Sequence, residues 1–545
     1  MAHKTCVMLL LLHEVISSSL NMPHHKQSIS KTLTKLACQP YLLFYLLSIT
    51  ILTGCGGGSD VSAAPDKLPP IQQVQSPDIT QFYFTVANNS NLSRDIRLQV
   101  DGDTFTGRVP TNVAVDTLVA TFTHSGSEVT VNSTLQTSDV TANDFTQIQM
   151  YTVRTSDGQI KSFSVDLTKF TGLPIVRLTI EGGASITSKE NYINGDVWID
   201  GGRNYVELVT VPMEIRGRGN STWDHPKKPY QMKLEEKSEF LGMPRDKKWL
   251  FLAEYSDKTM LRNTIAFEMG YMSSLSWTPQ SVFSEVYLNN NYIGTYNIAQ
   301  KVEESDNRLP LGDDGFLLEI DQFERLDSDD VYFTTDRFLI NVKEPSIDWG
   351  SSELNDITTI IRNFEQALFA PQFKRQDIGY RSHIDVDSFI DWFLISEITK
   401  NVDSKFFSSI YLHVLPGEKI KMGPLWDFDL SFGNVDYADS RYPEGYWVKE
   451  HEWYDRLFQD PAFVSQVQAR FAFFKENQSV ILDKIDAYAQ QLKWAQQEND
   501  DRWQTLGIYV WPNPVFYATY DEEVEHMKNW FTTRMNWLDD ALNSL

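Results

Sequence analysis

The sequence predicts an α+β protein in which a small all-β module precedes a larger domain of mixed strands and helices. Two observations support this fold class. Short strands with alternating apolar residues, and no helical stretch, run from about residue 78 to 170. After residue 174, strands dominate to about residue 345 and helices dominate beyond it. The 545 residues, 41% of them hydrophobic and 22% charged, are enough for roughly two to four globular domains.

Charge and cysteine content exclude several functions. The chain has 48 Lys and Arg against 73 Asp and Glu, a net charge of −25, which repels phosphate backbones, so no nucleic-acid partner is expected. The cysteines are Cys6, Cys38 and Cys55, so the chain beyond residue 55 has no disulfide, thiolate zinc site or Cys nucleophile. No two histidines stand four residues apart, which excludes the paired zinc ligands of a zincin.

Residues 1–54 are predicted to be a signal peptide. A lysine-bearing segment precedes the apolar run from Tyr41 to Leu52, which is too short to span a bilayer. The next residues, Leu-Thr-Gly-Cys, resemble a bacterial lipobox and imply lipidation of Cys55, with Met22 as an alternative start to Met1. Because Gly56 follows the cysteine, we expect a protein of the bacterial cell envelope, held at the outer membrane by its N-terminal lipid only, on the periplasmic or the surface face.

Residues 55–77 are predicted to be the lipidated cysteine and a flexible tether, because they are rich in Gly, Ser, Ala and Pro. Residues 78–170 contain strands such as ITQFYFTV and TLVATFTH. Asp157-Gly158 is typical of a type I′ hairpin turn. Strands at this spacing predict a small immunoglobulin-like β-sandwich, which has no visible site and for which spacing or docking is the expected role.

Residues 174–545 are predicted to form one α+β domain. A helix from Thr259 to about Met272 interrupts the early strands, and an extended segment is expected from Ile420 to Phe432. Apolar residues at intervals of three and four predict the later helices, which are Asn355 to Phe369, Val386 to Thr399, Phe463 to Lys493 and Asp521 to Leu542.

A glycine-containing segment follows the predicted strand VPMEIR and precedes the lysines Lys228 and Lys233. Glycines allow backbone N–H groups to approach an anion closely, and nearby cations neutralise phosphates. A glycine-rich hairpin with surface Arg and Lys fits the same pattern. The candidate residues of this segment are Arg216, Gly217, Arg218, Gly219, Asn220 and Ser221.

A second cluster surrounds the start of the helix predicted near residue 259. Asp257 is placed to cap this helix, whose first turns carry Arg262 and Asn263. Capping explains most of the pattern, and burial of the arginine against a site is the functional alternative.

The most informative cluster contains three aspartates. If the segment WDFDL is extended, its period of two places Asp427 and Asp429 on one face, opposite Trp426 and Phe428. Two carboxylates on an apolar strand are costly without a cation, and oxygen ligands suit Mg²⁺. Asp403, at the end of a helix, is then placed to accept the proton of an attacking hydroxyl, as the catalytic-loop Asp of a protein kinase does. An acidic surface turn with satisfied caps is the alternative.

Six motifs follow one another along the larger domain, and they are RGRGNSTW-x3-KKPY, LGMPRDKKWLFLAEYSDKTMLRN, VYLNNNYIGTYNI, FLLEID, EITKNVD and GPLWDFDLSFGN. In these motifs and in their order the chain resembles the CotH family, which is named for a spore-coat protein kinase. The resemblance implies a divergent, atypical protein-kinase-like fold over residues 174–545, with a motif core at 174–440 and a helical part at 441–545. It also implies binding of ATP and of Mg²⁺ or Mn²⁺, and phosphorylation of Ser on protein substrates.

Carried over by position, the resemblance makes Asp403 the catalytic base and Asp427 the metal-binding aspartate, with Asp429 close by. It makes Lys233, or alternatively Lys228, the phosphate-contacting lysine. It also places the loop of residues 216–221 near the nucleotide.

Two positions depart from the pattern. Gln300 stands where many relatives have Glu, with Glu303 and Glu304 shortly after it. Ser408 stands where a protein kinase has a second metal-binding Asn. The first departure removes the Glu that would pair with the strand lysine at this position. The second removes an expected ligand of a second metal ion.

The leading hypothesis is an exported, Mg²⁺-dependent atypical kinase that transfers the γ-phosphoryl group of ATP to Ser or Thr of an envelope or surface protein. The first alternative is a catalytically silent, kinase-like surface scaffold or adhesin, because little ATP is found outside the cytoplasm and a fold does not fix a function. The second is a glycoside hydrolase with paired carboxylates, suggested by 14 Trp and 13% aromatic residues, although no sugar-hydrolase motif is visible.

Overall fold

A computed structural model of the chain describes residues 76–545, except 93–94, 111–112 and 203. The predicted signal peptide, Cys55 and nearly all of the tether lie outside these residues. Within the described part, no helix is both long and apolar enough to cross a bilayer.

The first part of the described chain consists of short strands, as the sequence predicts. They form sheets ordered β2-β1-β6, β3-β4-β11-β10-β7-β8 and β5-β9. Alternate side chains enter a shared aromatic core, in which the ring of Phe82 lies 4.9 Å from Tyr151 and 5.8 Å from Phe122, centroid to centroid. The strand-rich character is confirmed, and the immunoglobulin type stays a prediction. The strands are β1 (Ile79–Phe84), β2 (Ile96–Arg97), β3 (Gln99–Asp101), β4 (Thr104–Pro110), β5 (Leu118–Val119), β6 (Thr121–His124), β7 (Glu128–Val131), β8 (Thr134–Leu135), β9 (Ala142–Asn143), β10 (Gln149–Arg154) and β11 (Ile160–Phe170).

The turn between β10 and β11 is a hairpin, but it is not of type I′. Arg154 pairs with Ile160, so the loop comprises residues 155–159 rather than two residues. A type I′ turn needs positive φ at both central residues. Here Gly158 has φ of 88°, whereas Asp157 is not among the residues with positive φ. The side chain of Asp157 instead accepts a hydrogen bond from the hydroxyl of Thr155 within the loop.

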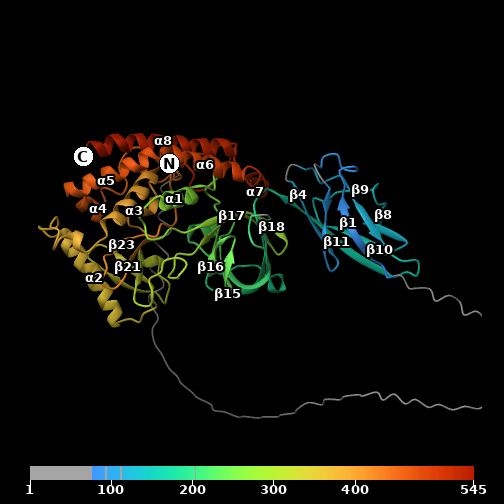
Figure 1. Ribbon diagram of the computed structural model, residues 1–545, viewed down its shortest axis with the longest axis horizontal. Helices are drawn as coiled ribbons and strands as arrows, with labels where there is room; N and C mark the ends of the chain where they lie inside the picture. Colours follow the sequence, from blue (N-terminus) through green and yellow to red (C-terminus); the bar gives the residue numbers. More distant parts are fainter. Residues whose placement is uncertain (1–75, 93–94, 111–112, 203) are drawn as a thin grey trace, which may run out of the picture. The chain divides into compact units, whose positions relative to one another are not determined.

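A closed barrel follows, with strand order β12-β13-β14-β15-β16-β18-β17 (Figure 1). Neighbouring strands are antiparallel except where β12 closes on β17 in parallel. Period-two alternation buries one face of each strand, as with Ile215, Met232 and Trp249. The strands are β12 (Ile175–Ile180), β13 (Ile193–Asp200), β14 (Leu208–Gly217), β15 (Tyr230–Phe240), β16 (Met243–Leu252), β17 (Ser281–Leu288) and β18 (Asn291–Gln300).

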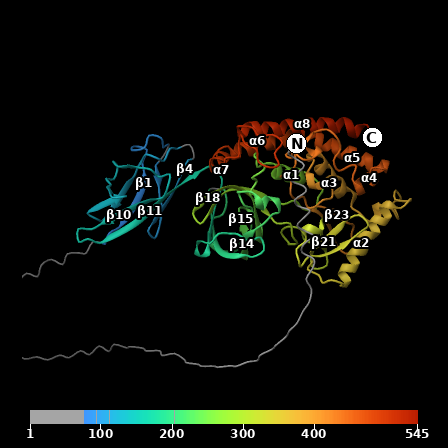
Figure 2. The ribbon, with the colours of Figure 1, turned by 180° about the vertical axis from the view of Figure 1, so that it is seen from behind.

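The remainder is an antiparallel sheet, β20-β21-β19-β22-β23, packed with helices. In both views α2 and α3 lie against this sheet, and α5, α6 and α8 run side by side (Figures 1 and 2). The strands are β19 (Phe316–Asp321), β20 (Val331–Thr334), β21 (Leu339–Glu344), β22 (Ile410–Val414) and β23 (Lys421–Met422). The helices are α1 (Arg262–Tyr271), α2 (Ser352–Phe369), α3 (Val386–Thr399), α4 (Glu452–Leu457), α5 (Pro461–Glu476), α6 (Gln478–Leu492), α7 (Ala495–Trp503) and α8 (Tyr520–Asn543).

Capping residues explain where several helices begin. The side chain of Ser351 accepts a hydrogen bond from the backbone N–H of Leu354 at α2, and Asp385 does the same from Ser388 at α3. Thr519 and Glu522 form a reciprocal capping box at α8. The predicted helix 463–493 is two helices, because the chain leaves the helical conformation at Asn477 between α5 and α6.

The predicted extended segment 420–432 is regular only at β23. Asp427 has φ of 65°, in the left-handed region, so a continuous strand through WDFDL is ruled out. Burial still alternates along it. Trp426 and Phe428 are 7% and 2% exposed, while Asp427 and Asp429 are only partly buried.

A buried lysine joins α7 to the barrel. The Nζ of Lys227 donates to the backbone carbonyl of Thr295 and, at 2.9 Å, to Oδ1 of Asn499. It lies 4.7 Å from the ring centroid of Tyr296, and no carboxylate of the described residues lies within 4.0 Å of it. Burial lowers the pKa of Lys227 to about 7, although Glu254 and Glu285 oppose the shift.

We expect Lys227 to make stability rise with pH above neutrality. Between the folded-state pKa near 7 and the unfolded value near 10.5, the unfolded chain binds a proton at this residue that the folded chain does not. The free energy of unfolding therefore gains roughly 1.4 kcal/mol per pH unit from this group. Urea denaturation at pH 7, 8 and 9 should show this gain in the wild type relative to Lys227→Met. Parallel pH profiles for the two proteins would contradict the assignment.

Candidate functional site

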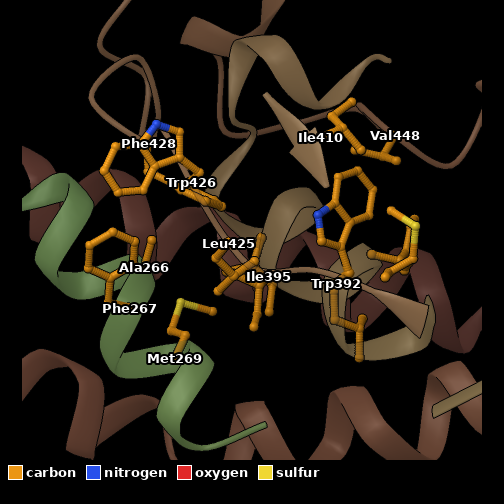
Figure 3. Packing of buried hydrophobic residues seen from close by; sticks show 14 of the residues in the cluster. Ala266, Phe267, Met269, Trp392, Ile395, Ile410, Leu425, Trp426, Phe428 and Val448 are labelled. Carbon is orange, nitrogen blue, oxygen red and sulfur yellow. The ribbon is translucent and has the colours of Figure 1, made fainter. Parts of the chain in front are cut away.

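The segment after β23 is anchored by buried aromatic side chains. Trp426 and Phe428 pack into the core beside Leu425 and α1 (Figure 3). The rings of Trp426 and Phe267 of α1 stack with centroids 6.3 Å apart. The anchoring leaves Asp427 and Asp429 less buried than the aromatic residues that flank them.

Two asparagines hold the backbone of Asp427 in its left-handed conformation. Nδ2 of Asn401 donates to the carbonyl of Asp427 at 3.0 Å, and Oδ1 of Asn263 accepts from the N–H of Phe428 at 2.7 Å. Because left-handed φ is unfavourable for a residue with a Cβ, these contacts are needed to maintain it. The backbone conformation at Asp427 therefore depends on residues of α1 and of the segment after α3.

Asp403, the third aspartate, lies in the segment that directly follows α3. Lys400 ends this helix in a left-handed conformation with φ of 44°, and a short 3₁₀ turn, η5 (Val402–Ser404), carries Asp403. Val402 N–H donates to the Leu430 carbonyl at 3.2 Å, which ties η5 to the segment of Asp427 and Asp429. The structure therefore brings the three predicted aspartates together.

The charge of Asp427 disfavours ionisation of the other two aspartates. Burial raises the pKa of Asp403 to about 7, and the charge of Asp427 adds to the effect. Burial raises the pKa of Asp427 also, against the charges of Arg218 and Arg325. Asp429 has its pKa raised well above the usual range by burial and by the Asp427 carboxylate. Such a cluster is stabilised when further positive charge is brought to it.

Glu254 adds a fourth carboxylate that the sequence interpretation did not single out. Nδ2 of Asn263 donates to both carboxylate oxygens of Glu254, at 3.2 and 3.3 Å. Burial, and then the charge of Asp257, raises the pKa of Glu254 to about 8. Asn263 thus links this carboxylate to the backbone that follows Asp427.

Arg218 is the cation of the glycine-containing segment that acts on this cluster. Its guanidinium lies over the Trp426 ring at 5.5 Å. The charge of Asp427 is the largest influence that favours its ionised form, while burial lowers its pKa. Arg216 instead lies 4.9 Å over the ring of Tyr192 and donates to the Glu190 carbonyl at 3.3 Å.

The two glycines of this segment serve local packing. A Cβ at Gly217 would lie 2.3 Å from the indole of Trp223, and Gly219 has φ of 86°. Asn220 and Ser221 are exposed and begin a 3₁₀ turn, η2 (Ser221–Asp224). The backbone therefore passes close to Trp223, and the arrangement agrees locally with the hairpin alternative.

Lys233 and Lys228 make side-chain contacts away from the three aspartates. Nζ of Lys233, a side chain 42% exposed, is 3.1 Å from Oε2 of Glu214 on the neighbouring strand. Nζ of Lys228 donates to the Trp223 carbonyl at 2.5 Å. Within the described part of the chain, no ion pair joins either lysine to Asp403, Asp427 or Asp429. The phosphate-contacting role stays a prediction for both.

Another strand lysine that pairs with a glutamate is Lys248, in β16. Its Nζ lies 2.9 Å from Oε2 of Glu303, which also pairs with Lys301 at 3.4 Å. Gln300, where the resemblance leads one to expect Glu, is fully buried and accepts a hydrogen bond from the Gln280 N–H at 2.9 Å. Glu303, three residues after Gln300, therefore pairs with Lys248 rather than with the predicted Lys233 or Lys228.

The Asp257 and Arg262 pair is structural in its contacts. Asp257 accepts hydrogen bonds from the N–H of Thr259 at 3.1 Å and of Arg262 at 2.9 Å, as expected for a carboxylate at a helix start. The buried Arg262 guanidinium pairs with Asp257 and donates to the Ser431 carbonyl at 3.0 Å. Arg262 therefore stabilises the segment that carries Asp427 and Asp429 through its hydrogen bond to Ser431.

Arg325, like Glu254, is a site residue that the sequence interpretation did not single out. It ends η3 (Phe323–Arg325), which begins two residues after β19, and its charge opposes the raised pKa of both Asp403 and Asp427. Its position four residues after the FLLEID motif was the available signal. Spacing along the chain does not show that this segment and Asp403 lie close together.

The donor set fits a small hard cation. Within the described residues there is no group of three His, Cys, Asp or Glu side chains placed to hold a metal ion together. Mg²⁺, however, is commonly bound through one or two carboxylates plus substrate phosphates and water. Asp427 and Asp429, whose pKa values are both raised, would supply these two carboxylates.

Comparisons with known proteins identify the family. The model of the family described as "CotH kinase protein" matches residues 215–538, more than half of the chain. Among solved structures, a putative glycoside hydrolase from Bacteroides thetaiotaomicron is similar at 12% identity, with a TM-score of 0.18, over 54% of this chain and 89% of that one. That TM-score supports no argument for the hydrolase alternative. A comparison with curated proteins found no match. The chain belongs to the CotH kinase family.

Proposed function

We propose that this protein is an exported CotH-type kinase that transfers the γ-phosphoryl group of ATP to Ser or Thr of an envelope or surface protein. The observation that carries the proposal is the cluster of Asp403, Asp427 and Asp429, in which the charge of Asp427 raises the pKa of the other two carboxylates and also acts on Arg218. Phosphoryl transfer needs positioning and charge neutralisation, and a partly buried cluster of carboxylates that gains stability from a cation is suited to both.

Each residue has a distinct role in this proposal. Asp403 accepts the proton of the attacking hydroxyl. The oxygen of that hydroxyl forms the new bond to the γ-phosphorus, and ADP departs. A base whose pKa is near 7 matches an operating pH near neutrality. Arg218 neutralises phosphate charge. Asp427 and Asp429 would hold Mg²⁺ or Mn²⁺, which supplies charge neutralisation of the phosphates when bound.

The envelope setting rests on the sequence. The expected signal peptide and lipidated Cys55 would keep the protein at the membrane by its N-terminal lipid only, and its acidic charge disfavours nucleic acid as a partner. Lys233 or Lys228 would contact phosphate only after a rearrangement of the side-chain contacts that both make in this structure.

Binding of ATP to the full-length protein, measured by calorimetry with and without Mg²⁺, tests the proposal. We expect Mg²⁺-dependent binding in the wild type. Asp403→Asn should bind ATP within about twofold of the wild type but transfer phosphate about 10² to 10⁴ times more slowly, because it removes only the base. Asp387→Asn, an exposed position at the start of α3, is the matched control and should change neither.

Two outcomes would refute the proposal. Absence of ATP binding by the wild type with either Mg²⁺ or Mn²⁺ would favour the silent scaffold. Equal rates of phosphate transfer by the wild type and Asp403→Asn would exclude Asp403 as the base.

A further inference from the structure

Arg325 is clamped to the segment that follows the proposed base. Its Nη1 donates to the hydroxyl of Ser408 at 2.7 Å, and its guanidinium carbon lies 4.7 Å over the ring of Phe407. Gln322, just before η3, donates from Nε2 to the Phe407 carbonyl at 2.9 Å. These contacts fix Arg325 against residues 407–408 and therefore near Asp403.

The guanidinium of Arg325 keeps most of its bonding capacity. An arginine has five N–H donors. In the described part of the chain the bond to Ser408 is the hydrogen bond that the Arg325 side chain donates, and no carboxylate oxygen lies within 4.0 Å of its guanidinium nitrogens. An arginine that is not engaged by a carboxylate retains donors in the planar arrangement that matches a phosphate.

The charge of Arg325 acts on both parts of the proposed machinery. It favours the ionised forms of Asp403 and Asp427, which burial disfavours in both cases. It does the same for Asp321, at the end of β19. A positive charge that is held by the contacts to Phe407 and Ser408 thus acts on both the base and the proposed metal ligand, independently of any bound ion.

Ser408 is the residue that leads to the inference. In protein kinases two metal ions take part, and a catalytic-loop Asn binds the second. Here the corresponding position has a hydroxyl, which is 1% exposed at the residue level and is occupied by the bond from Arg325. The geometry points to Arg325 as the substitute for that second ion: the enzyme uses a single metal ion, and the guanidinium supplies the remaining positive charge to the transferred phosphoryl group. This inference rests on the proposed function.

The number of metal ions bound with nucleotide tests the inference directly. The full-length protein would be titrated with Mn²⁺ in the presence of a non-hydrolysable ATP analogue, and free Mn²⁺ followed by electron paramagnetic resonance. We expect one Mn²⁺ per bound nucleotide in the wild type. Two ions per nucleotide would overturn this inference and leave the proposed function standing, whereas a wild type that binds no nucleotide would overturn both.

Substitution of the arginine gives an independent readout. Arg325→Met should weaken binding of the Mn²⁺-loaded analogue at least about tenfold and slow transfer by about 10³-fold or more, as expected for an arginine that neutralises transition-state charge. Arg325→Lys should recover part of both losses because it keeps the charge. Arg375→Met, in an exposed ion pair, is the matched control. Wild-type analogue affinity and rate in Arg325→Met would overturn the inference.

Discussion

Replacing Asp427 by Asn should abolish phosphate transfer, with a loss of at least about 10³-fold, and should also remove Mg²⁺-dependent binding of ATP. The reason is that Asp427 is the proposed metal ligand and the carboxylate whose charge bears most on Arg218 and, after burial, on Asp429. Transfer of labelled phosphate and calorimetric binding of ATP would be measured on the full-length wild type and variant.

The same variant should remain folded and should be no less stable than the wild type. Burial raises the pKa of Asp427 above its unfolded value, so the folded state disfavours the ionised form at every pH above about 4. An uncharged amide of the same shape removes that cost, a common trade between stability and function. Asp377→Asn, at an exposed carboxylate, is the control. A variant that keeps wild-type transfer would disprove the role assigned to Asp427.

Removal of the buried arginine of α8 should produce the largest loss of stability. Arg534 is fully buried, and its Nη2 lies 2.6 Å from Oε1 of Glu397 of α3, which is also fully buried. Its Nη1 donates to the carbonyls of Pro443 and Gly445 at 2.8 and 2.7 Å. The pair thus joins α3 and α8 to the loop that carries Pro443 and Gly445. Arg534→Met should lower the free energy of unfolding by about 3–5 kcal/mol, because it leaves the carboxylate of Glu397 buried without its partner.

Urea denaturation at pH 7 would measure this effect. Glu397 also accepts hydrogen bonds from the N–H groups of Trp447, Val448 and Lys449, at 2.6, 2.7 and 2.9 Å. The double variant Glu397→Gln with Arg534→Met, which removes both charges and keeps an acceptor for these groups, should therefore recover part of the loss. A loss below about 1 kcal/mol for Arg534→Met alone would place the pair with weak surface ion pairs and refute the prediction.

The regular elements were largely predictable from local pattern. Helix α3 has the predicted bounds, Val386–Thr399, and α2 and α8 begin within three residues of their predicted starts. A strong period of three to four and good capping residues define such helices from neighbours along the chain. The break at Asn477 was missed although five polar residues, 475–479, interrupt the apolar pattern there.

The irregular segments were not predictable in the same way. The expected strand WDFDL is bent at Asp427, whose left-handed backbone is held by Asn263 and Asn401. The type I′ turn expected at Asp157-Gly158 is a longer loop. In both cases the conformation depends on side-chain contacts that override the local preference.

The sequence by itself determined the α+β class, most helix positions, the family-defining motifs and the identity of the three aspartates. Only the tertiary structure decided that Arg325 and Glu254 join them, that Arg218 rather than Arg216 acts on them, and that Lys248 pairs with Glu303. Local pattern depends on residues a few positions apart, for which the backbone sets the spacing. Electrostatic coupling depends on distance through space and on burial, which arise only when distant segments pack together.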